Sequence, residues 1–223
     1  MNYGTRDARL SRDVPQLPVT LATEAPLRAY LGDPSMVVDY LARPGVLRTG
    51  HFRLLSGLHA DRFVAFSRLV DDPHALSAIA GWLTSVVAPW MPTAVLAPST
   101  AGVALGSALG RRLGAPLHIA RLDDSGRPDG LLGGVDLCDQ QVLLINDVVT
   151  TGDGMAALAV VARAAGANVA GGAWFLSRTD VPVSERIEAP TTCVGLLELP
   201  AAALEQCAGC RGEEPLEDAL DLN

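Results

Sequence analysis

Residues 142–154 constrain the fold of this chain more than any other segment. A short apolar run from Val142 to Ile145 ends abruptly in acid, hydroxyl and glycine residues, and an Ala-rich segment follows. Such a run is typical of a strand buried on both faces of a parallel sheet. Thr150–Gly154 would then open a helix, where free backbone N–H groups and the positive end of the helix dipole attract a phosphate. The pattern predicts a strand, a phosphate-binding loop and a helix, with Asp147 beside the phosphate.

Strand-like and helix-like segments alternate through the middle of the chain. We expect strands at 94–97, 117–120, 142–145 and 169–176, and helices at 73–87, 102–113 and 155–165. This alternation indicates βαβ units in an α/β fold with a parallel sheet, whose ligands bind at the carboxyl ends of the strands. Earlier in the chain we expect helices at 20–31 and 35–41 and two short strands within 50–64, and later a polar loop at 122–134.

The charge balance excludes several classes of function. The net charge of −8 argues against general nucleic-acid binding, so any phosphate site must be local. All 17 basic residues are Arg, which excludes P-loop NTPases and mechanisms that use a lysine Schiff base. The start of the chain lacks the apolar core of a signal peptide and no apolar run approaches membrane-spanning length, so we expect a cytoplasmic protein without a membrane partner.

The four cysteines are too few for a disulfide framework in a chain of 223 residues. Cys207 and Cys210 form a Cys-x-x-Cys pair that offers two zinc ligands. A structural zinc site needs four ligands, and no second pair or neighbouring His in the sequence supplies the others. We therefore expect both thiols to be reduced and metal-free.

Four segments resemble, in order, those of a known enzyme family. Residues 142–154 resemble the 5-phosphoribosyl 1-diphosphate (PRPP) signature of type I phosphoribosyltransferases. Residues 36–215 are similar to the orotate phosphoribosyltransferase branch, in particular to a subgroup with a Cys-x-x-Cys near the carboxyl end. The matching segments are the hood element at 50–63, the diphosphate loop at 98–102, the PRPP loop at 146–154 and the tail at 207–215. The resemblance implies a central parallel sheet flanked by helices, with a small N-terminal hood.

The resemblance also implies an activity and its residues. The 5-phosphoribosyl group would pass from PRPP to a nitrogenous base, orotate or a related base of pyrimidine biosynthesis, with release of diphosphate. The cofactor would be Mg²⁺, carried by PRPP without direct protein ligands, and the enzyme would be a homodimer. The implied PRPP-binding residues are Ser99, Thr100, Ala101, Gly102, Asn146, Asp147, Val148, Val149, Thr150, Thr151, Gly152, Asp153 and Gly154. The implied catalytic residues are Asp147, Asn146, Arg121 and Arg127, and the implied base-binding residues are Phe63, Thr150 and Arg178.

The chain departs from the family pattern at two places. Asn146 stands where relatives have the first of two adjacent acids, and it brings no negative charge. The segment that matches the mobile catalytic loop holds Arg121 and Arg127 among three aspartates, Asp123, Asp124 and Asp129. We therefore expect slow turnover with orotate, or another acceptor base, and we expect Arg121 to be the most sensitive loop position.

The sequence leaves two classes of function open. One is the enzyme, and the other is a non-catalytic PRPP-binding or nucleotide-binding regulator on the same fold. We expect four regions: a flexible arm at 1–19, N-terminal helices and the hood element at 20–72, an α/β core at 73–190 and a C-terminal tail at 191–223.

Overall fold

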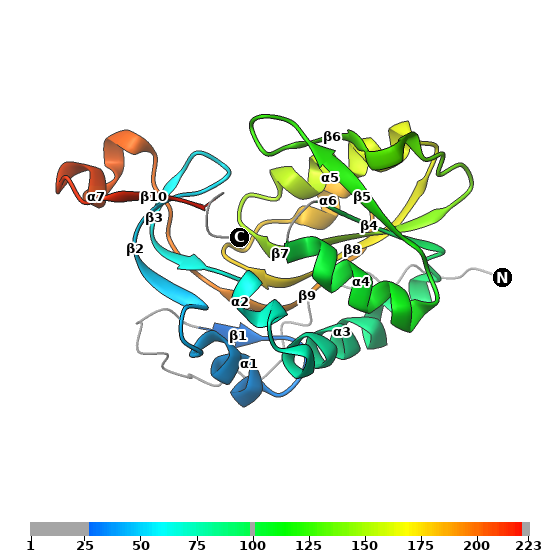
Figure 1. Cartoon of the computed structure of the whole chain (residues 1–223), viewed down its shortest axis with the longest axis horizontal. Helices are drawn as coiled ribbons and strands as arrows, with labels where there is room; N and C mark the ends of the chain where they lie inside the picture. The colour runs from blue at the N-terminus through cyan, green and yellow to red at the C-terminus, as the bar shows by residue number, and fades with distance from the viewer. Residues whose placement is uncertain (1–26, 99–100, 220–223) are drawn as a thin grey trace.

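Seven strands form the larger sheet, in the order β1-β9-β8-β7-β4-β5-β6 (Figure 1). The computed structural model describes residues 27–98 and 101–219. The strands are β1 (Leu27–Ala29), β4 (Ala94–Pro98), β5 (Leu117–Leu122), β6 (Pro128–Leu131), β7 (Gln141–Val149), β8 (Asn168–Ser177) and β9 (Thr191–Leu197). The five inner strands are parallel, and the edge strands β1 and β6 are antiparallel to their neighbours. This confirms the expected α/β class with a mostly parallel central sheet.

Strand β7 occupies the centre of this sheet, between β4 and β8. The side chains of residues 142–145 are fully buried and alternate between two hydrophobic cores. Leu143 and Ile145 pack into one core, whereas Val142 and Leu144 pack into the other. Burial on both faces is the arrangement that the apolar run predicts. The strand continues past the run to Val149 and so carries Asn146 and Asp147 to its carboxyl end.

Two pairs of helices cover the two faces of the sheet (Figure 1). Helices α3 (Pro73–Val87) and α4 (Ala101–Leu113) pack into the core of one face, and α5 (Asp153–Ala164) and α6 (Val183–Ile187) into that of the other. Helix α3 confirms the predicted bounds, and the Asp72 side chain caps it by accepting hydrogen bonds from the backbone N–H groups of His74 and Ala75. The remaining short helices are α1 (Pro34–Leu41), α2 (Ser67–Val70), η1 (Ala88–Trp90), η2 (Leu132–Gly134), η3 (Leu204–Gln206) and α7 (Ala208–Arg211).

A smaller three-stranded sheet, the hood, stands beside the larger one and lies on the left in Figure 1. Strands β2 (Leu47–Arg53) and β3 (His59–Val64) form the predicted hairpin, and β10 (Leu216–Asp218) pairs with β2 in parallel. Within the described part of the chain, the hydrophobic core of the hood consists of six buried residues: Phe52, Leu54, Ala60, Phe63, Ala65 and Ala219. Segments from opposite ends of the chain therefore build the hood together.

The helix expected at 20–31 is wrong in its described part. Residues 27–29 form strand β1, which pairs antiparallel with β9 through Leu27 and Leu197. Pairing satisfies the backbone groups of the β9 edge, and that requirement outweighs the local helical pattern. The sheet thus includes β1 and β9 from outside the expected core at 73–190. The arm expected at 1–19 lies outside the described residues.

The loop expected at 122–134 is also wrong, because most of it forms a hairpin. Strand β5 extends to Leu122, and β6 returns beside it from Pro128. The turn forms because the Asp123 carboxylate accepts hydrogen bonds from the backbone N–H groups of Ser125 and Arg127. Polar composition suggested a loop, whereas the Asp-rich tip is the turn of an edge hairpin.

None of the helices that the structure describes combines the length and the apolar character needed to cross a membrane.

Candidate functional site

A cavity of about 300 Å³ lies between the hood and the carboxyl ends of the central strands. The hood lines it with Leu54, Leu55, Ser56, Phe63, Val64 and Ala219. The core lines it with the continuous segment from Asn146 to Met155 and with Arg178. The turn between β5 and β6 adds Arg127. The cavity therefore brings together most of the residues selected from the sequence.

The phosphate loop connects β7 to α5 and lines the cavity from Thr150 to Gly154. Gly152 occupies the N-cap position of α5 in the left-handed region, with φ of 81°. A Cβ atom there would lie 3.1 Å from Cγ2 of Val183, so both its conformation and its surroundings favour glycine. The hydroxyl of Thr179 donates to the backbone carbonyl of Thr150 and anchors the loop to the segment after β8. This loop presents a helix N-terminus to the cavity and suits an anion.

Asp153 is the one acid within this loop, and it has partners of its own. The Thr151 hydroxyl donates to its carboxylate at 2.8 Å, and this bond holds the pKa of Asp153 below its ordinary value. Arg186 from α6 forms an ion pair with the other carboxylate oxygen. Because Arg186 offsets its charge, Asp153 opposes an anion at the loop less than a lone carboxylate would.

Asp147 places a carboxyl group in the wall of the cavity at the end of β7. Asp147 is only 8% exposed to solvent. Burial raises the pKa of Asp147 above its ordinary value, because the charged form loses its hydration. Neighbouring Asn146 also lines the cavity, and its Oδ1 accepts a hydrogen bond from the Asp147 backbone N–H at 2.9 Å. A buried carboxylate with a perturbed pKa in a cleft is typical of a functional site.

Arg178 is the most unusual residue of the cavity wall. It is 2% exposed, and within the described part of the chain its Nε and Nη2 atoms are buried without a hydrogen-bond partner. Burial lowers the pKa of Arg178 to about 10, so the guanidinium still carries its charge at neutral pH. The backbone holds the residue in place, since its N–H donates to the carbonyl of Val149 at 2.8 Å. The charge of Asp61 favours the cation, but buried guanidinium nitrogens without hydrogen-bond partners are costly, which favours an anionic ligand group beside them.

Phe63 and Thr150 line the same cavity as Arg178, so the three residues selected for base binding meet there. Phe63 is nearly buried and packs against Phe52, with ring centroids 5.7 Å apart. The hood thus supplies an aromatic wall and the core a cation. A flat base with a negative substituent matches both features.

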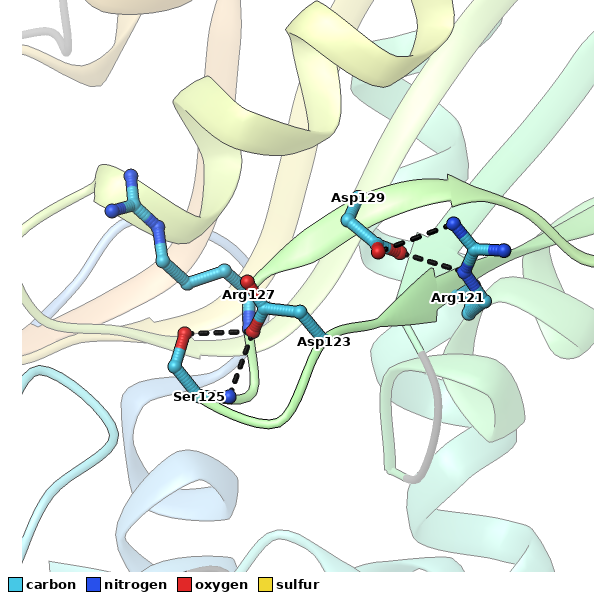
Figure 2. A network of polar contacts seen from close by, with 5 residues as sticks. All are labelled: Arg121, Asp123, Ser125, Arg127 and Asp129. Carbon is cyan, nitrogen blue, oxygen red and sulfur yellow. Dashed lines mark hydrogen bonds and ion pairs between the residues drawn. The ribbon is translucent and has the colours of Figure 1, made fainter.

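The two loop arginines lie differently (Figure 2). Arg121 donates from Nε and Nη2 to the two carboxylate oxygens of Asp129, at 2.8 and 3.1 Å, and does not line the cavity of its own chain. Arg127 does line the cavity, and Figure 2 shows its guanidinium pointing away from the Arg121–Asp129 pair. Asp123 is occupied within the turn, where Ser125 donates to it. The structure thus places Arg127 at the cavity and Arg121 outside it.

The expected diphosphate loop is only partly described. Ser99 and Thr100 lie outside the described residues, and Ala101 and Gly102 begin α4. A Cβ atom on Gly102 would lie 3.8 Å from the Asn146 Cα. The start of α4 therefore lies against the carboxyl end of β7.

The expectation that no histidine accompanies Cys207 and Cys210 is wrong. His51 and His59, on the two strands of the hood hairpin, lie beside the cysteine pair, and one potential ligand atom from each of the four residues lies within 4.8 Å of the others. The predicted hairpin could have indicated that the two histidines lie close together, because folding about Ser56-Gly57 brings their positions near each other on paired strands. The position of the C-terminal segment beside these histidines could not be predicted from local sequence. Sequence reasoning also missed Arg186, whose exposed side chain follows no recognisable motif.

Comparison with known proteins places the chain in a family. No family model matches the chain. An orotate phosphoribosyltransferase from Chlorobium phaeobacteroides strain BS1 is 30% identical over 152 residues, which cover 66% of this chain and 76% of that protein. The chain belongs to the orotate phosphoribosyltransferase family. The orotate phosphoribosyltransferase of Chlorobaculum parvum is 29% identical over 173 residues, 78% of this chain and 88% of that protein.

Solved structures show the same fold. The crystal structure of orotate phosphoribosyltransferase from Aeropyrum pernix has a TM-score of 0.57 and 24% identity, and it covers 71% of this chain and 93% of its own. Leishmania donovani UMP synthase has a TM-score of 0.62 and 20% identity, over 74% of this chain and 36% of that one. The fold is therefore that of type I phosphoribosyltransferases. As a family member the chain is an enzyme that transfers phosphoribosyl from PRPP to a base, which decides against the non-catalytic regulator. Membership of the Cys-x-x-Cys subgroup stays a prediction.

The phosphate loop provides a test with a matched control. Gly152→Ala should lower the free energy of unfolding by about 1 to 2 kcal/mol, because an L residue in the left-handed region is strained. Gly154→Ala adds the same methyl group in the first turn of α5, where a Cβ atom meets nothing within 4 Å. It should leave stability unchanged or raise it by up to about 1 kcal/mol. Urea unfolding followed by circular dichroism measures the free energy of unfolding of both variants. Equal losses of stability would contradict the left-handed conformation of Gly152.

Proposed function

We propose that this orotate phosphoribosyltransferase-family enzyme transfers the phosphoribosyl group of PRPP to a pyrimidine that carries a carboxylate, with orotate as the first candidate. The observation that carries the proposal is the buried Arg178 guanidinium, which faces a ligand-sized cavity with two nitrogen atoms unpaired among the described residues. A planar carboxylate matches the guanidinium fork and offsets its buried charge. The curated relatives, which are named orotate phosphoribosyltransferases, support this choice of base.

The PRPP half of the cavity follows from the loop and the end of β7. Backbone N–H groups of Thr150–Gly154 would hold the 5-phosphate at the N-terminus of α5. Asn146 and Asp147 would hydrogen-bond the ribose hydroxyls, one as an amide and the other as a carboxylate. As the bond to diphosphate breaks, the ribose gains positive charge, and the buried Asp147 carboxylate stabilises that charge strongly because water is largely excluded. Catalysis in this proposal rests on electrostatic stabilisation of the sugar.

The cavity also fits a magnesium ion that arrives with PRPP. Asp147 and Asn146 offer oxygen atoms, the ligand type that Mg²⁺ prefers, and no cation among the described residues lowers the pKa of Asp147. When bound, Mg²⁺ would neutralise charge on the diphosphate. We propose that the ion is held mainly by PRPP oxygens and water, with Asp147 nearby as the protein's negative group.

Arg127 is the loop residue that suits the leaving group. It lines the cavity from the turn between β5 and β6, and its arrangement differs from that of Arg121, which Asp129 holds. A cation beside the departing diphosphate lowers the barrier more than it strengthens substrate binding, because charge builds up as the bond breaks. The family resemblance adds a homodimer, in which the hairpin of one subunit would approach the site of the other.

The reaction itself is tested by diphosphate release from PRPP and Mg²⁺ with a panel of bases: orotate, uracil, adenine and hypoxanthine. We expect turnover with orotate, and a loss of about 100-fold or more in kcat for Asp147→Asn while the fold persists. For the wild type, kcat/KM should fall on acidification at a higher pH than an exposed Asp would give, because protonation of a carboxyl with a raised pKa begins earlier. Undiminished turnover of Asp147→Asn would contradict this role.

The base preference is tested at Arg178. Arg178→Gln removes the charge that pairs with the carboxylate, so kcat/KM for orotate should fall by about 100-fold, equivalent to about 3 kcal/mol. Any activity with uracil, which has no carboxylate, should be unchanged or rise. Arg111→Gln, on the exposed side of α4, serves as the control and should change neither. Equal losses for orotate and uracil would show that Arg178 acts on structure and not on base recognition.

The leaving-group role is tested by comparing two loop variants. Arg127→Ala should lower kcat by tenfold or more with a smaller change in PRPP binding, whereas Arg121→Ala should have the lesser effect, because Asp129 occupies Arg121. Steady-state kinetics with varied PRPP separates kcat from KM. This order revises the expectation that Arg121 is the most sensitive loop position. A larger loss of kcat for Arg121→Ala than for Arg127→Ala would support the original expectation. It would also favour a position of Arg121 in the site of the neighbouring subunit.

A further inference from the structure

Four potential metal ligands meet at the far side of the hood, outside the cavity lining. His51 comes from β2 and His59 from the start of β3, while Cys207 and Cys210 come from the C-terminal segment that crosses these strands. Three of the four residues are buried, and Cys210 is half-buried. Residues separated by about 150 positions in the chain thus converge on one point.

The ligand atoms are spaced as in a tetrahedral zinc site. His51 Nε2 lies 3.0 Å from His59 Nδ1, 3.3 Å from Cys207 Sγ and 3.5 Å from Cys210 Sγ. Cys210 Sγ lies 3.2 Å from His59 Nδ1. Ordinary Zn–N and Zn–S bonds of about 2.0 and 2.3 Å give separations between ligand atoms of about 3.3 to 3.8 Å. These four separations match that range or are up to a few tenths of an ångström shorter, and the remaining pairs lie within 4.8 Å, so small side-chain shifts would admit the ion.

The outer face of His51 orients the ring for such a role. Its Nδ1 lies 3.1 Å from the backbone carbonyl oxygen of Glu214. A carbonyl oxygen can only accept a hydrogen bond, so the donor must be the ring nitrogen. Nδ1 therefore carries the hydrogen, and Nε2 directs its lone pair toward the other three ligand atoms. Metal-binding histidines usually donate their second N–H to a carbonyl or carboxylate in this way.

Gly209 explains the spacing between the two cysteines. A Cβ atom on Gly209 would lie 2.7 Å from Cγ of the His51 ring, closer than any real contact. The turn of α7 can therefore bring both sulfur atoms to the ring only with glycine at this position. The Cys-Ala-Gly-Cys segment is shaped to pack onto a histidine.

We propose that His51, His59, Cys207 and Cys210 bind one zinc ion, which fastens the C-terminal segment to the hood. Two thiolates neutralise the charge of Zn²⁺, and two imidazoles complete a four-coordinate set typical of structural zinc. Without a metal, the same buried groups would rely on thiols, which are weak donors and acceptors. The closed ligand set leaves no position for a substrate, so the ion has a structural role.

The hood needs stabilisation beyond that of its own hydrophobic core. Its hydrophobic core has six buried residues among those that the structure describes, too few to stabilise a three-stranded sheet strongly. The C-terminal segment joins it through the pairing of β10 with β2, the mutual backbone hydrogen bonds of His59 and Ala202, and the Arg48–Glu217 ion pair. A zinc ion at the cluster would add the stabilisation of metal binding to folding. It would thereby fix Phe63 and Ala219, which line the cavity from the hood.

The test begins with the wild-type chain, purified without a polyhistidine tag from cells grown with zinc. Elemental analysis should find about one zinc per chain. Exchange for Co²⁺ should give the visible absorption of tetrahedral cobalt with thiolate ligands. A thiol reagent should label exposed Cys138 at once and Cys207 and Cys210 only after a strong chelator is added. Less than about 0.1 metal per chain after growth and after reconstitution, or a Cys207–Cys210 disulfide in the native protein, would overturn the proposal.

Matched variants assign the ligands. Cys207→Ser and His59→Asn should lower the zinc content at least tenfold, whereas the controls Cys138→Ser and His118→Asn should retain it. Chelation of the wild type should lower its unfolding temperature, and zinc should restore it. If a ligand variant fails to fold, the zinc content and cobalt spectrum of the wild type still decide. Metal content is measured without turnover, so a failure here is separate from a failure of the proposed reaction.

Discussion

The structure depends first on the burial of β7 on both faces. Because residues 142–145 fill two hydrophobic cores at once, the strand has one position and one register in the sheet. Hydrogen bonding to β4 and β8 then fixes where the strand ends. Asn146 and Asp147 and the phosphate loop follow directly, so apolar packing determines the position of every polar group in this half of the cavity. A site on the end of a rigid strand keeps its geometry better than one on a free loop.

That rigid frame holds polar groups that are unfavourable in the absence of substrate. Arg178 is a buried cation with two unpaired nitrogen atoms among the described residues, and Asp147 is a carboxyl whose pKa burial raises. Each lowers the stability of the unliganded fold, and each becomes favourable beside a ligand of opposite charge. The two groups call for opposite partners: an anionic substituent at Arg178 and a cationic sugar or metal at Asp147. We therefore propose that substrate supplies the opposite charges beside Arg178 and Asp147, and we expect a gain in stability on binding.

The local parts of the fold could be predicted from the sequence, and the non-local parts could not. Helix 73–87, the strand at 142–145 and the hood hairpin follow from apolar spacing and turn residues, which act over a few positions. Strands β1 and β6 depend on edges of the sheet that local spacing does not reveal, so they were expected as helix and loop. The phosphate loop and Asp147 were proposed from their motif, and Phe63 and Arg178 from a family resemblance, and all of them line the cavity. The two Arg178 nitrogens that lack a hydrogen bond within the described residues, and the meeting of His51 with Cys207, result from packing, which no local pattern contains.

The hood shows why contacts distant in sequence bear on specificity. One wall of the proposed base pocket is Phe63, and its position depends on a sheet with few buried residues among those described. Arg178, which lines the same cavity, is held by the large sheet through its backbone hydrogen bond to Val149. Discrimination between bases needs both walls at a constant separation, because a carboxylate that reaches the guanidinium must also place its ring against the aromatic face. We therefore propose that whatever fastens the C-terminal segment to β2 and β3 influences base selection without contacting the base. Because the hydrophobic core of the hood is small, discrimination between bases in this proposal depends strongly on the attachment of the C-terminal segment to β2 and β3.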